Sequence, residues 1–407
     1  MRRGPFVLSL VAALSTAAFA ACRFSTNGLE EIANSGEDAA SDGATTEDDA
    51  VRQDGGDAAR EATSEDVAAE AGPEGGADAT DATSDGGDAD APPEAGPADA
   101  PWDGPCPAAC TGGCIEGTCI INGTTAAGDV VCPDGLPCKV RCTKGNECPG
   151  AVRCGDGACT VECGSGSTYN ACKGAIDCTR AASCDIQCQG NDACASAVTC
   201  GAGPCKVSCG TKDTYRACKG AVDCTRASSC ELQCLGQDAC AGAVSCGAGT
   251  CSVTCGTKDS YRACKGAVDC GKSSACTIAC IGGDSCQSSV TCGPGTCDVT
   301  CGVGDRYNQC QGTVSCGKAS KCQIDCVGGS SCGSLVSCGA GPCRVGCGGS
   351  GASYQCKSGV ACAAACACDV TCAGTTTCGG GTVCPATSCN AGSKGCTSTP
   401  TGCSTCK

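Results

Sequence analysis

The chain contains no histidine, and aromatic residues make up only 2% of its 407 residues. Between Cys106 and Lys407 there is no phenylalanine, tryptophan or methionine, and only 33 of these 302 residues are leucine, isoleucine or valine. The lack of histidine excludes Ser-His and Cys-His nucleophile systems. The lack of large apolar side chains excludes a conventional hydrophobic core, because chains of such composition normally stay disordered.

What the chain has instead is cysteine, 55 residues in all, of which 54 follow residue 105. Disulfides stabilise small exported folds that bury little apolar area, so we expect an oxidising compartment and a cystine framework. Structural zinc sites favour paired Cys-x-x-Cys spacings, and here only Cys403 and Cys406 have that spacing. We therefore predict no metal and no cofactor. An exported metal or thiol buffer remains as the alternative.

The cysteines recur with a strict 46-residue period and no insertion, which is typical of stacked structural units. One position of the repeat is occupied by Cys132, Cys178, Cys224, Cys270, Cys316 and Cys362. Each repeat divides into two similar halves, which we call coils, and the step from one coil start to the next alternates between 22 and 24. The coil starts are residues 126, 148, 172, 194, 218, 240, 264, 286, 310, 332, 356 and 378.

The alternation Val-x-Cys and Cys-x-Val-x-Cys within each coil predicts two short strands with cysteine and a β-branched residue on one face. Such strands cannot fold alone, but stacked coils give parallel ladders around one interior. The fold class is therefore all-β, a parallel β-solenoid of about twelve coils held by disulfides. A string of independent disulfide beads is the rival fold. Counted from Cys106 onward, the number of cysteines before each coil start from residue 148 to residue 356 is odd, which predicts that bridges link successive coils.

Charge is divided as sharply as cysteine. Residues 23–105 hold 23 acidic residues and three arginines, which gives 3 − 23 = −20, whereas the region from Cys106 onward holds 22 basic and 20 acidic residues. The acidic segment is rich in Ala, Asp, Glu and Gly, and we expect it to be a disordered tail. The repeat region has no net basic field, which argues against nucleic acid as a partner.

The segment from Met1 to Cys22 combines Arg2 and Arg3, a short apolar run and the sequence Phe19-Ala20-Ala21-Cys22. This segment resembles the lipobox of bacterial lipoproteins, in which the cysteine is lipidated and becomes the mature N-terminus. The resemblance implies a lipid anchor at Cys22, with outer-membrane lipid as a partner and the cell envelope, outer membrane or surface, as the location. The alternative is an ordinary secretory signal in which Cys22 has no such role.

These observations divide the chain into five parts. They are a signal peptide (1–21), a lipid-anchored acidic linker (22–105), a cysteine-rich N-terminal cap (106–125), the 46-residue repeats of the solenoid (126–392) and a C-terminal cap (393–407).

Outward-facing repeated residues are the candidate contact face. Asp177 and its copies form a row, but they maintain the repeat, whereas an active site should break it, so we predict that the protein is not an enzyme. The tyrosines recur in the longer loops, where they are expected to shield cystines or, alternatively, to stack on sugars. The candidate residues are Lys173, Asp177, Lys219, Asp223, Lys265, Asp269, Tyr169, Tyr215, Tyr261 and Tyr307.

The motif Gly201-Ala202-Gly203 resembles the Gly-x-Gly turn of calcium-binding β-roll repeats. Those repeats place Asp where this chain has Cys205, so tight-turn geometry is the preferred explanation for the glycines.

The sequence as a whole predicts a lipid-anchored, non-catalytic envelope protein with a structural or adhesive role. Its possible partners are a surface polysaccharide or another envelope protein.

Overall fold

The computed structural model describes residues 104–303, 306–349, 353–373, 376–383, 390–392 and 395–397. All of them belong to one unit, Ala89–Lys407. The expectations about the signal peptide, Cys22 and the acidic segment up to residue 103 lie outside the described residues. So do Ser393, Cys403 and Cys406 of the expected C-terminal cap.

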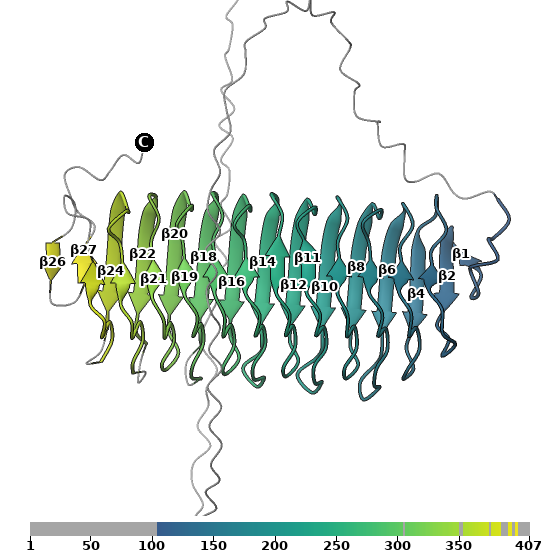
Figure 1. Ribbon diagram of the computed structural model, residues 1–407, viewed down its shortest axis with the longest axis horizontal. Helices are drawn as coiled ribbons and strands as arrows, with labels where there is room; N and C mark the ends of the chain where they lie inside the picture. Colours follow the sequence, from purple (N-terminus) through teal and green to yellow (C-terminus); the bar gives the residue numbers. More distant parts are fainter. Residues whose placement is uncertain are drawn as a thin grey trace, which may run out of the picture. The chain divides into compact units, whose positions relative to one another are not determined.

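The described residues form a rod of stacked coils, and each coil gives one strand to each of two facing sheets (Figure 1). The long-strand sheet has thirteen strands, and the short-strand sheet has twelve. The long-strand sheet contains, in order, β1 (Cys114–Ile115), β2 (Thr118–Asn122), β4 (Cys138–Cys142), β6 (Ala158–Cys163), β8 (Ser183–Cys188), β10 (Pro204–Cys209), β12 (Ser229–Cys234), β14 (Thr250–Cys255), β16 (Ala275–Cys280), β18 (Thr296–Cys301), β20 (Lys321–Cys326), β22 (Pro342–Cys347) and β24 (Ala367–Cys372). The short-strand sheet contains β3 (Val130–Val131), β5 (Val152–Arg153), β7 (Ile176–Asp177), β9 (Val198–Thr199), β11 (Val222–Cys224), β13 (Val244–Cys246), β15 (Val268–Asp269), β17 (Val290–Thr291), β19 (Val314–Ser315), β21 (Val336–Ser337), β23 (Val360–Ala361) and β25 (Thr382–Val383).

All strands from β2 to β25 pair in parallel with the equivalent strand of the next coil. The register pairs equivalent residues of adjacent coils, so that Cys205 pairs with Cys184 on one side and with Cys230 on the other. No helix occurs among the described residues. The fold prediction is confirmed, an all-β parallel solenoid of about twelve coils, and the continuous sheets exclude the string of beads. At a spacing of ~4.8 Å, twelve coils make a rod of roughly 55 Å.

The interior contains one aliphatic side chain from each sheet per coil, with cystines on both sides of them. In one coil Val152 of β5 and Val161 of β6 are both fully buried, and Cys154, Cys159 and Cys163 surround them at 5% exposure or less. Alternation in the long strands turns the intervening residues outward, as in the burial pattern of β6. The strands are short because each coil of 22 or 24 residues must also contain a turn and a loop. β-Branched residues suit these strands because they pack well on a pleated, half-buried surface.

Each of the eleven coils that start at residues 126 to 356 is closed at both of its edges by a disulfide. At the turn edge, where the chain passes from the short strand to the long strand, the bridge joins cysteines five or six residues apart, as in Cys154–Cys159 and Cys178–Cys184. At the loop edge, where the chain returns to the next short strand, the bridged cysteines are nine or six residues apart, as in Cys163–Cys172. A coil with spans of five and nine is therefore longer than its neighbours with spans of six and six, which accounts for the alternating coil length.

The loop-edge bridges confirm that disulfides link successive coils, because Cys163–Cys172 joins the coil that starts at Cys148 to the next one. All bridges with both partners described join cysteines five to nine residues apart, and among them none joins equivalent cysteines of adjacent coils. Equivalent side chains in a parallel stack point in the same direction, whereas a disulfide requires the two Cβ vectors to converge. The sulfurs of Cys154 and Cys178 approach to 3.5 Å, but both are already in disulfides, so this is a van der Waals contact without a shared proton.

Hairpins stand at both ends of the parallel stack. At the start, β1 pairs antiparallel with β2, and the bridges Cys106–Cys114 and Cys110–Cys119 tie this hairpin together. At the other end, β26 (Asn390–Gly392) pairs antiparallel with β27 (Gly395–Thr397), which lies beside β24. The outermost strands, β1 with two residues and β26 with three, are short, and short edge strands give a poor template for end-to-end association.

The glycines of the Gly-x-Gly motif have a reason other than the predicted tight-turn conformation. Neither Gly201 nor Gly203 has a positive φ, but a Cβ atom on Gly203 would lie 1.7 Å from the carbonyl oxygen of Ala182 in the preceding coil. The glycines are needed because stacked turns approach one another closely. Among the non-glycine residues, the left-handed positions of the coils lie elsewhere, at the coil-start cysteines and, as far as Tyr354, two residues before them, as at Asn170 (φ 59°) and Cys172 (φ 51°).

Candidate functional site

The predicted aspartate row is present on the outer face of the short-strand sheet. Asp177, Asp223 and Asp269 occupy one position in every second coil, and Thr199 or Ser245 stands between them. Each carboxylate accepts a hydrogen bond from the backbone N–H two residues further on, at 3.0, 2.9 and 2.7 Å. The row therefore caps the turn edge, in the manner of Asx-turns.

The electrostatics of Asp177 agree with this structural role. Partial desolvation raises the pKa of its carboxyl, but the hydrogen bonds from Thr179 and the nearby charge of Arg153 outweigh that cost and hold the pKa below its ordinary value. A carboxyl kept ionised in this way is a poor general acid at neutral pH.

The predicted lysine row lies at the loop edge, where two of its members are engaged in ion pairs. Lys219 pairs with Asp192, and Lys265 pairs with Asp238, in each case the aspartate that stands two residues before the preceding coil start. Lys173 is exposed, and its carbonyl oxygen accepts a hydrogen bond from the Ser196 hydroxyl at 2.7 Å. The lysines are thus part of a repeated surface pattern that links neighbouring coils.

The four predicted tyrosines lie in the longer loops and are 45% to 64% exposed. Each forms a single parallel bridge with the loop of the next coil, as Tyr261 does with Gly283. A Cβ atom on Gly283 would lie 2.8 Å from the Tyr261 ring, so the ring rests on that loop. The Arg306 guanidinium lies 5.3 Å from the centroid of the Tyr261 ring and donates a 2.8 Å hydrogen bond to the Tyr261 hydroxyl. The tyrosine backbones therefore pair with the loops of the next coils, and the Tyr261 ring is also covered by a guanidinium.

Groups of three sulfurs recur in the interior, for example those of Cys154, Cys159 and Cys178, within 4.8 Å of one another. Every cysteine whose side chain is described is disulfide-bonded. Zinc and other soft metals bind thiolates, so these sulfurs offer ligands only after reduction.

The repeat changes at the loop edge between residues 306 and 357, although the cystine framework continues through Cys301–Cys310, Cys326–Cys332 and Cys347–Cys356. Ser330 stands where earlier repeats have Asp192 and Asp238, while Lys357 keeps the position of Lys219 and Lys265. Gln311 replaces the intervening lysine. Tyr354 is displaced by one residue from the tyrosine position and occupies a left-handed position (φ 63°).

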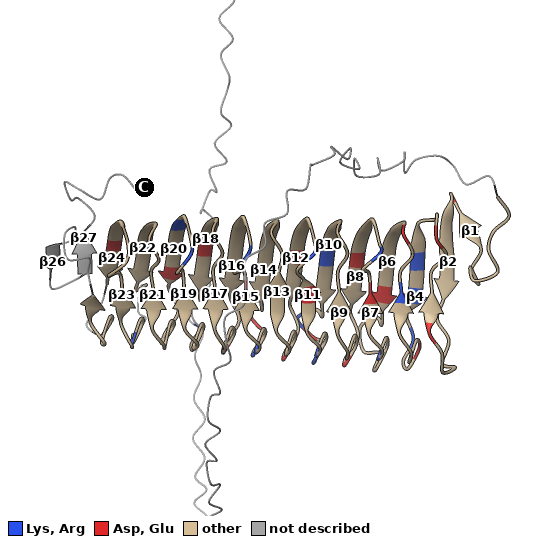
Figure 2. Cartoon of the chain, turned by 45° about the horizontal axis from the view of Figure 1, so that its top comes forward, with Lys and Arg blue, Asp and Glu red and all other residues tan. Residues whose placement is uncertain are grey.

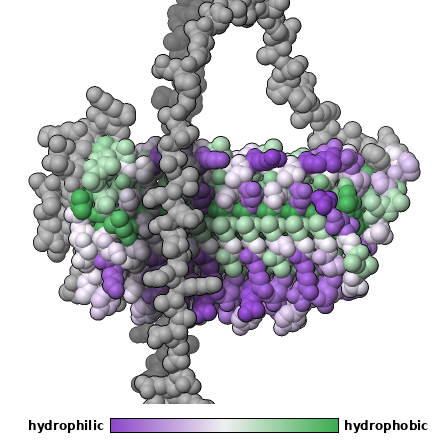
Figure 3. Space-filling model, viewed as in Figure 1, coloured by the Kyte–Doolittle hydropathy of each residue, from purple (hydrophilic) through white to green (hydrophobic). Residues whose placement is uncertain are grey.

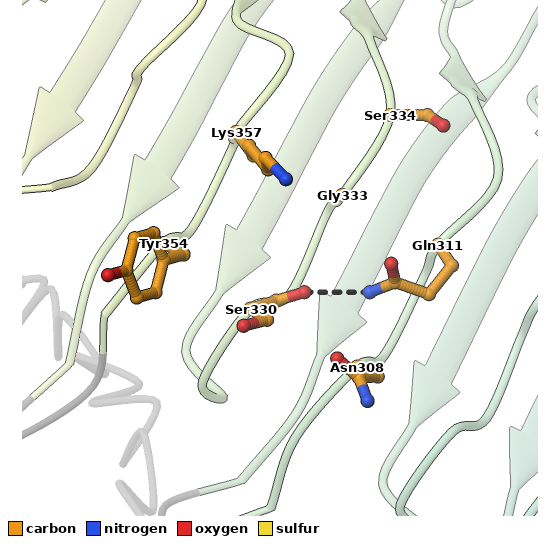
Figure 4. Close-up of a pocket in the computed structure, with 7 residues that line it drawn as sticks. All are labelled: Asn308, Gln311, Ser330, Gly333, Ser334, Tyr354 and Lys357. Carbon is orange, nitrogen blue, oxygen red and sulfur yellow. Dashed lines mark hydrogen bonds between the residues drawn. The ribbon is translucent and has the colours of Figure 1, made fainter.

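These departures surround a pocket of about 390 Å³ at the loop edge, which is lined by residues of four successive coils (Figure 4). Lys357 points toward the segment that carries Gly333, with Tyr354 on the same side of this segment as Lys357 and Gln311 on the other (Figure 4). Gln311 donates a 2.7 Å hydrogen bond to the carbonyl oxygen of Ser330. The pocket is lined by Asn308, Gln311, Ser330, Gly333, Ser334, Tyr354 and Lys357.

The sequence predictions did not include this pocket, although one signal for it was present. The departures at residues 311, 330 and 354 can be read by aligning the 46-residue repeats, but only the structure shows that they meet in space. Of the predicted contact residues, none lines the pocket.

Acidic and basic residues are interspersed along the two sheets (Figure 2). The end of the chain differs, because residues 326–407 contain four basic residues and a single acidic one, Asp369 of β24. In the face shown in Figure 3, an apolar band follows the long axis of the rod between more hydrophilic bands, as expected when the same residue types stack coil after coil.

Within the described residues, no helix has both the length and the apolar character needed to cross a membrane. No protein-family model, curated protein or solved structure matches the chain.

Proposed function

We propose that this chain is an exported, non-catalytic protein that presents a rigid cystine solenoid at the cell envelope and acts by surface contact. In this proposal Cys22 carries the lipid anchor in the outer membrane, and the acidic linker separates the anchor from the solenoid. The partner is a surface polysaccharide or another envelope protein.

The observation that supports a contact role is the regular closure, by a disulfide at both edges, of the eleven coils that start at residues 126 to 356. A framework that repeats without interruption gives a stiff, evenly spaced surface and withstands proteases and denaturing conditions outside the cell. The repeated carboxylates and ammonium groups contribute to this stiffness. Asp177 caps a turn within its coil, and Lys219 links neighbouring coils through its ion pair with Asp192.

The proposal is tested by expressing the full chain and its Cys22→Ser variant in a bacterium with two membranes. We expect the wild-type protein to fractionate with outer membranes and to partition into detergent, and the variant to appear as soluble exported protein. Membrane association that is unchanged in Cys22→Ser would contradict the anchor. Failure of the purified protein to bind envelope fragments would contradict the contact role.

A count of free thiols under denaturant on the same material separates this proposal from an exported thiol or metal buffer. The envelope protein should have essentially no free thiols, whereas a buffer should have many and should bind zinc in proportion to them.

A further inference from the structure

We propose that the loop-edge pocket formed by Asn308, Gln311, Ser330, Tyr354 and Lys357 binds an acidic sugar residue, a sugar ring that carries a carboxylate. The inference rests on the proposed contact function and names the ligand class that this surface selects. It goes beyond that function because it assigns the recognition to one place on the rod, at which the repeat is broken.

The charge of Lys357 is the first argument. In two earlier repeats the equivalent lysine is neutralised by an aspartate, in Asp192–Lys219 and Asp238–Lys265, but here Ser330 takes the aspartate position. Among the described residues Lys357 has no ion pair, and the single acidic residue after Asp325, Asp369, lies in the long-strand sheet. An exposed ammonium without a fixed counter-charge favours an anionic partner, and one such charge suits a ligand with one carboxylate per ring.

The polar lining is the second argument. The Gln311 amide nitrogen donates to the Ser330 carbonyl, and the Asn308 amide nitrogen donates to Asp284 at 3.0 Å. These bonds orient the side chains and leave both amide oxygens as acceptors, while the hydroxyls of Ser330 and Ser334 can donate or accept. A set of fixed acceptors and hydroxyls around an open pocket matches a ligand that is itself rich in hydroxyl groups.

The tyrosine is the third argument. In the regular repeats the ring lies one residue earlier and rests on the loop of the next coil, as Tyr261 rests on Gly283. The one-residue displacement of Tyr354 places it at the left-handed position that Asn308 occupies in the preceding repeat, and its ring lines the pocket with 55% of the residue exposed. An exposed aromatic face provides a flat apolar surface for the C–H groups of a sugar ring.

The same features argue against other small ligands. A metal cation would meet an ammonium and no carboxylate or thiolate, and an apolar ligand would find no apolar wall except the tyrosine ring. The pocket volume of about 390 Å³ lies within the range of ~300–1,000 Å³ that is usual for small-molecule sites. The pocket is therefore large enough for a sugar residue but offers too little positive charge for a polyphosphate.

The test is isothermal titration of the oxidised full chain with trigalacturonate and with neutral trigalactose as the matched ligand. We expect trigalacturonate to bind at least tenfold more tightly than trigalactose, and the difference to shrink as salt is added. Ser330→Asp, which restores the residue found at positions 192 and 238, should weaken trigalacturonate binding at least tenfold without disturbing the fold. Lys357→Gln should do the same, and Tyr354→Asn should weaken both ligands.

Lys219→Gln is the control, because it removes an equivalent lysine from a regular coil and should leave trigalacturonate binding unchanged. Equal binding of the acidic and neutral ligands, or wild-type affinity in Ser330→Asp and Lys357→Gln, would overturn the proposal. So would a lack of trigalacturonate binding by the wild-type chain. If envelope fragments still bind in that case, the pocket assignment fails while the proposed contact function stands.

Discussion

The regular coils around Asp192–Lys219 and the divergent coils around Ser330–Lys357 share one backbone and differ in their outer side chains. Both regions have the same alternation of disulfides, Cys209–Cys218 in one and Cys347–Cys356 in the other, each spanning nine residues. The regular coils close their loop edge with ion pairs, and the divergent coils leave a polar pocket there.

The comparison teaches that framework and surface are separable in this fold. The cystines and the two buried aliphatic rows define each coil, so outward residues can change without disturbing the stack. In the regular coils some of those residues form ion pairs with residues of neighbouring coils. An outward side chain can bind an external ligand only where it makes no such contact within the stack. Lys357 meets this condition, because Ser330 replaces the aspartate that would form its ion pair. The first prediction tests the shared framework, and the later ones test the outer groups.

The largest effect is expected from reduction, which removes what both regions have in common. Each coil buries few aliphatic side chains, each worth ~1.5–3 kcal/mol, against ~1 kcal/mol or more of backbone entropy per ordered residue. We expect the reduced and alkylated chain to lose its β-type circular dichroism and its protease resistance in both regions, without denaturant. Retention of the β signal after complete alkylation would show that the disulfides are incidental to the fold.

Removal of a single bridge should cost about the same in either region. Cys246→Ala/Cys251→Ala and Cys338→Ala/Cys343→Ala each open a five-residue turn in a buried position. We expect about 2 kcal/mol of local stability to be lost in each variant. Hydrogen exchange should show the loss spreading over neighbouring coils on both sides. A clearly larger cost in one region would break the claim that the framework is uniform.

Exchange of the outer groups between the regions should have a smaller effect. Asp192→Ser creates in a regular coil the situation found at Ser330, and Ser330→Asp does the reverse. Because such surface ion pairs are worth ~0.2–1 kcal/mol, we expect Asp192→Ser to lower stability and Ser330→Asp to raise it within that range. Thermal unfolding at low and high salt measures both changes, and an effect that is independent of salt would argue against ion pairing.

The smallest effect is expected from acid. The folded pKa of Asp177 is depressed, so its contribution is fully present above the unfolded pKa of ~3.9 and is lost as the pH falls through the folded value. We expect a loss of about 0.5 kcal/mol, the low end for one hydrogen bond. Hydrogen exchange at the Thr179 amide should rise in this range, whereas the turn after Ser315, which has no carboxylate, should be insensitive. Asp177→Asn should abolish the pH dependence.

Much of the architecture follows from local spacing and was predictable. The 46-residue period, its division into a longer and a shorter coil and the alternation in Cys-x-Val-x-Cys favour stacked parallel strands, because a period without insertions is expected when every copy contacts its neighbour in the same way. The linkage of successive coils follows from parity. The choice between bridges along the stack and bridges across each coil was not predictable, because both pairs of cysteines satisfy the Cα separation that a disulfide needs.

Which outer residues are free to bind a ligand could be decided only in three dimensions. The sequence shows a row of lysines and a row of aspartates, but Lys219 meets Asp192, which lies far from it along the chain, only because coils stack in register. The same stacking brings Asn308, Gln311, Ser330 and Tyr354 from three coils to one pocket beside Lys357. The sequence by itself thus determines the repeating unit, since its spacing and cysteines act locally. The tertiary structure alone decides which side chains meet across coils, because those contacts depend on the register and direction of the stack.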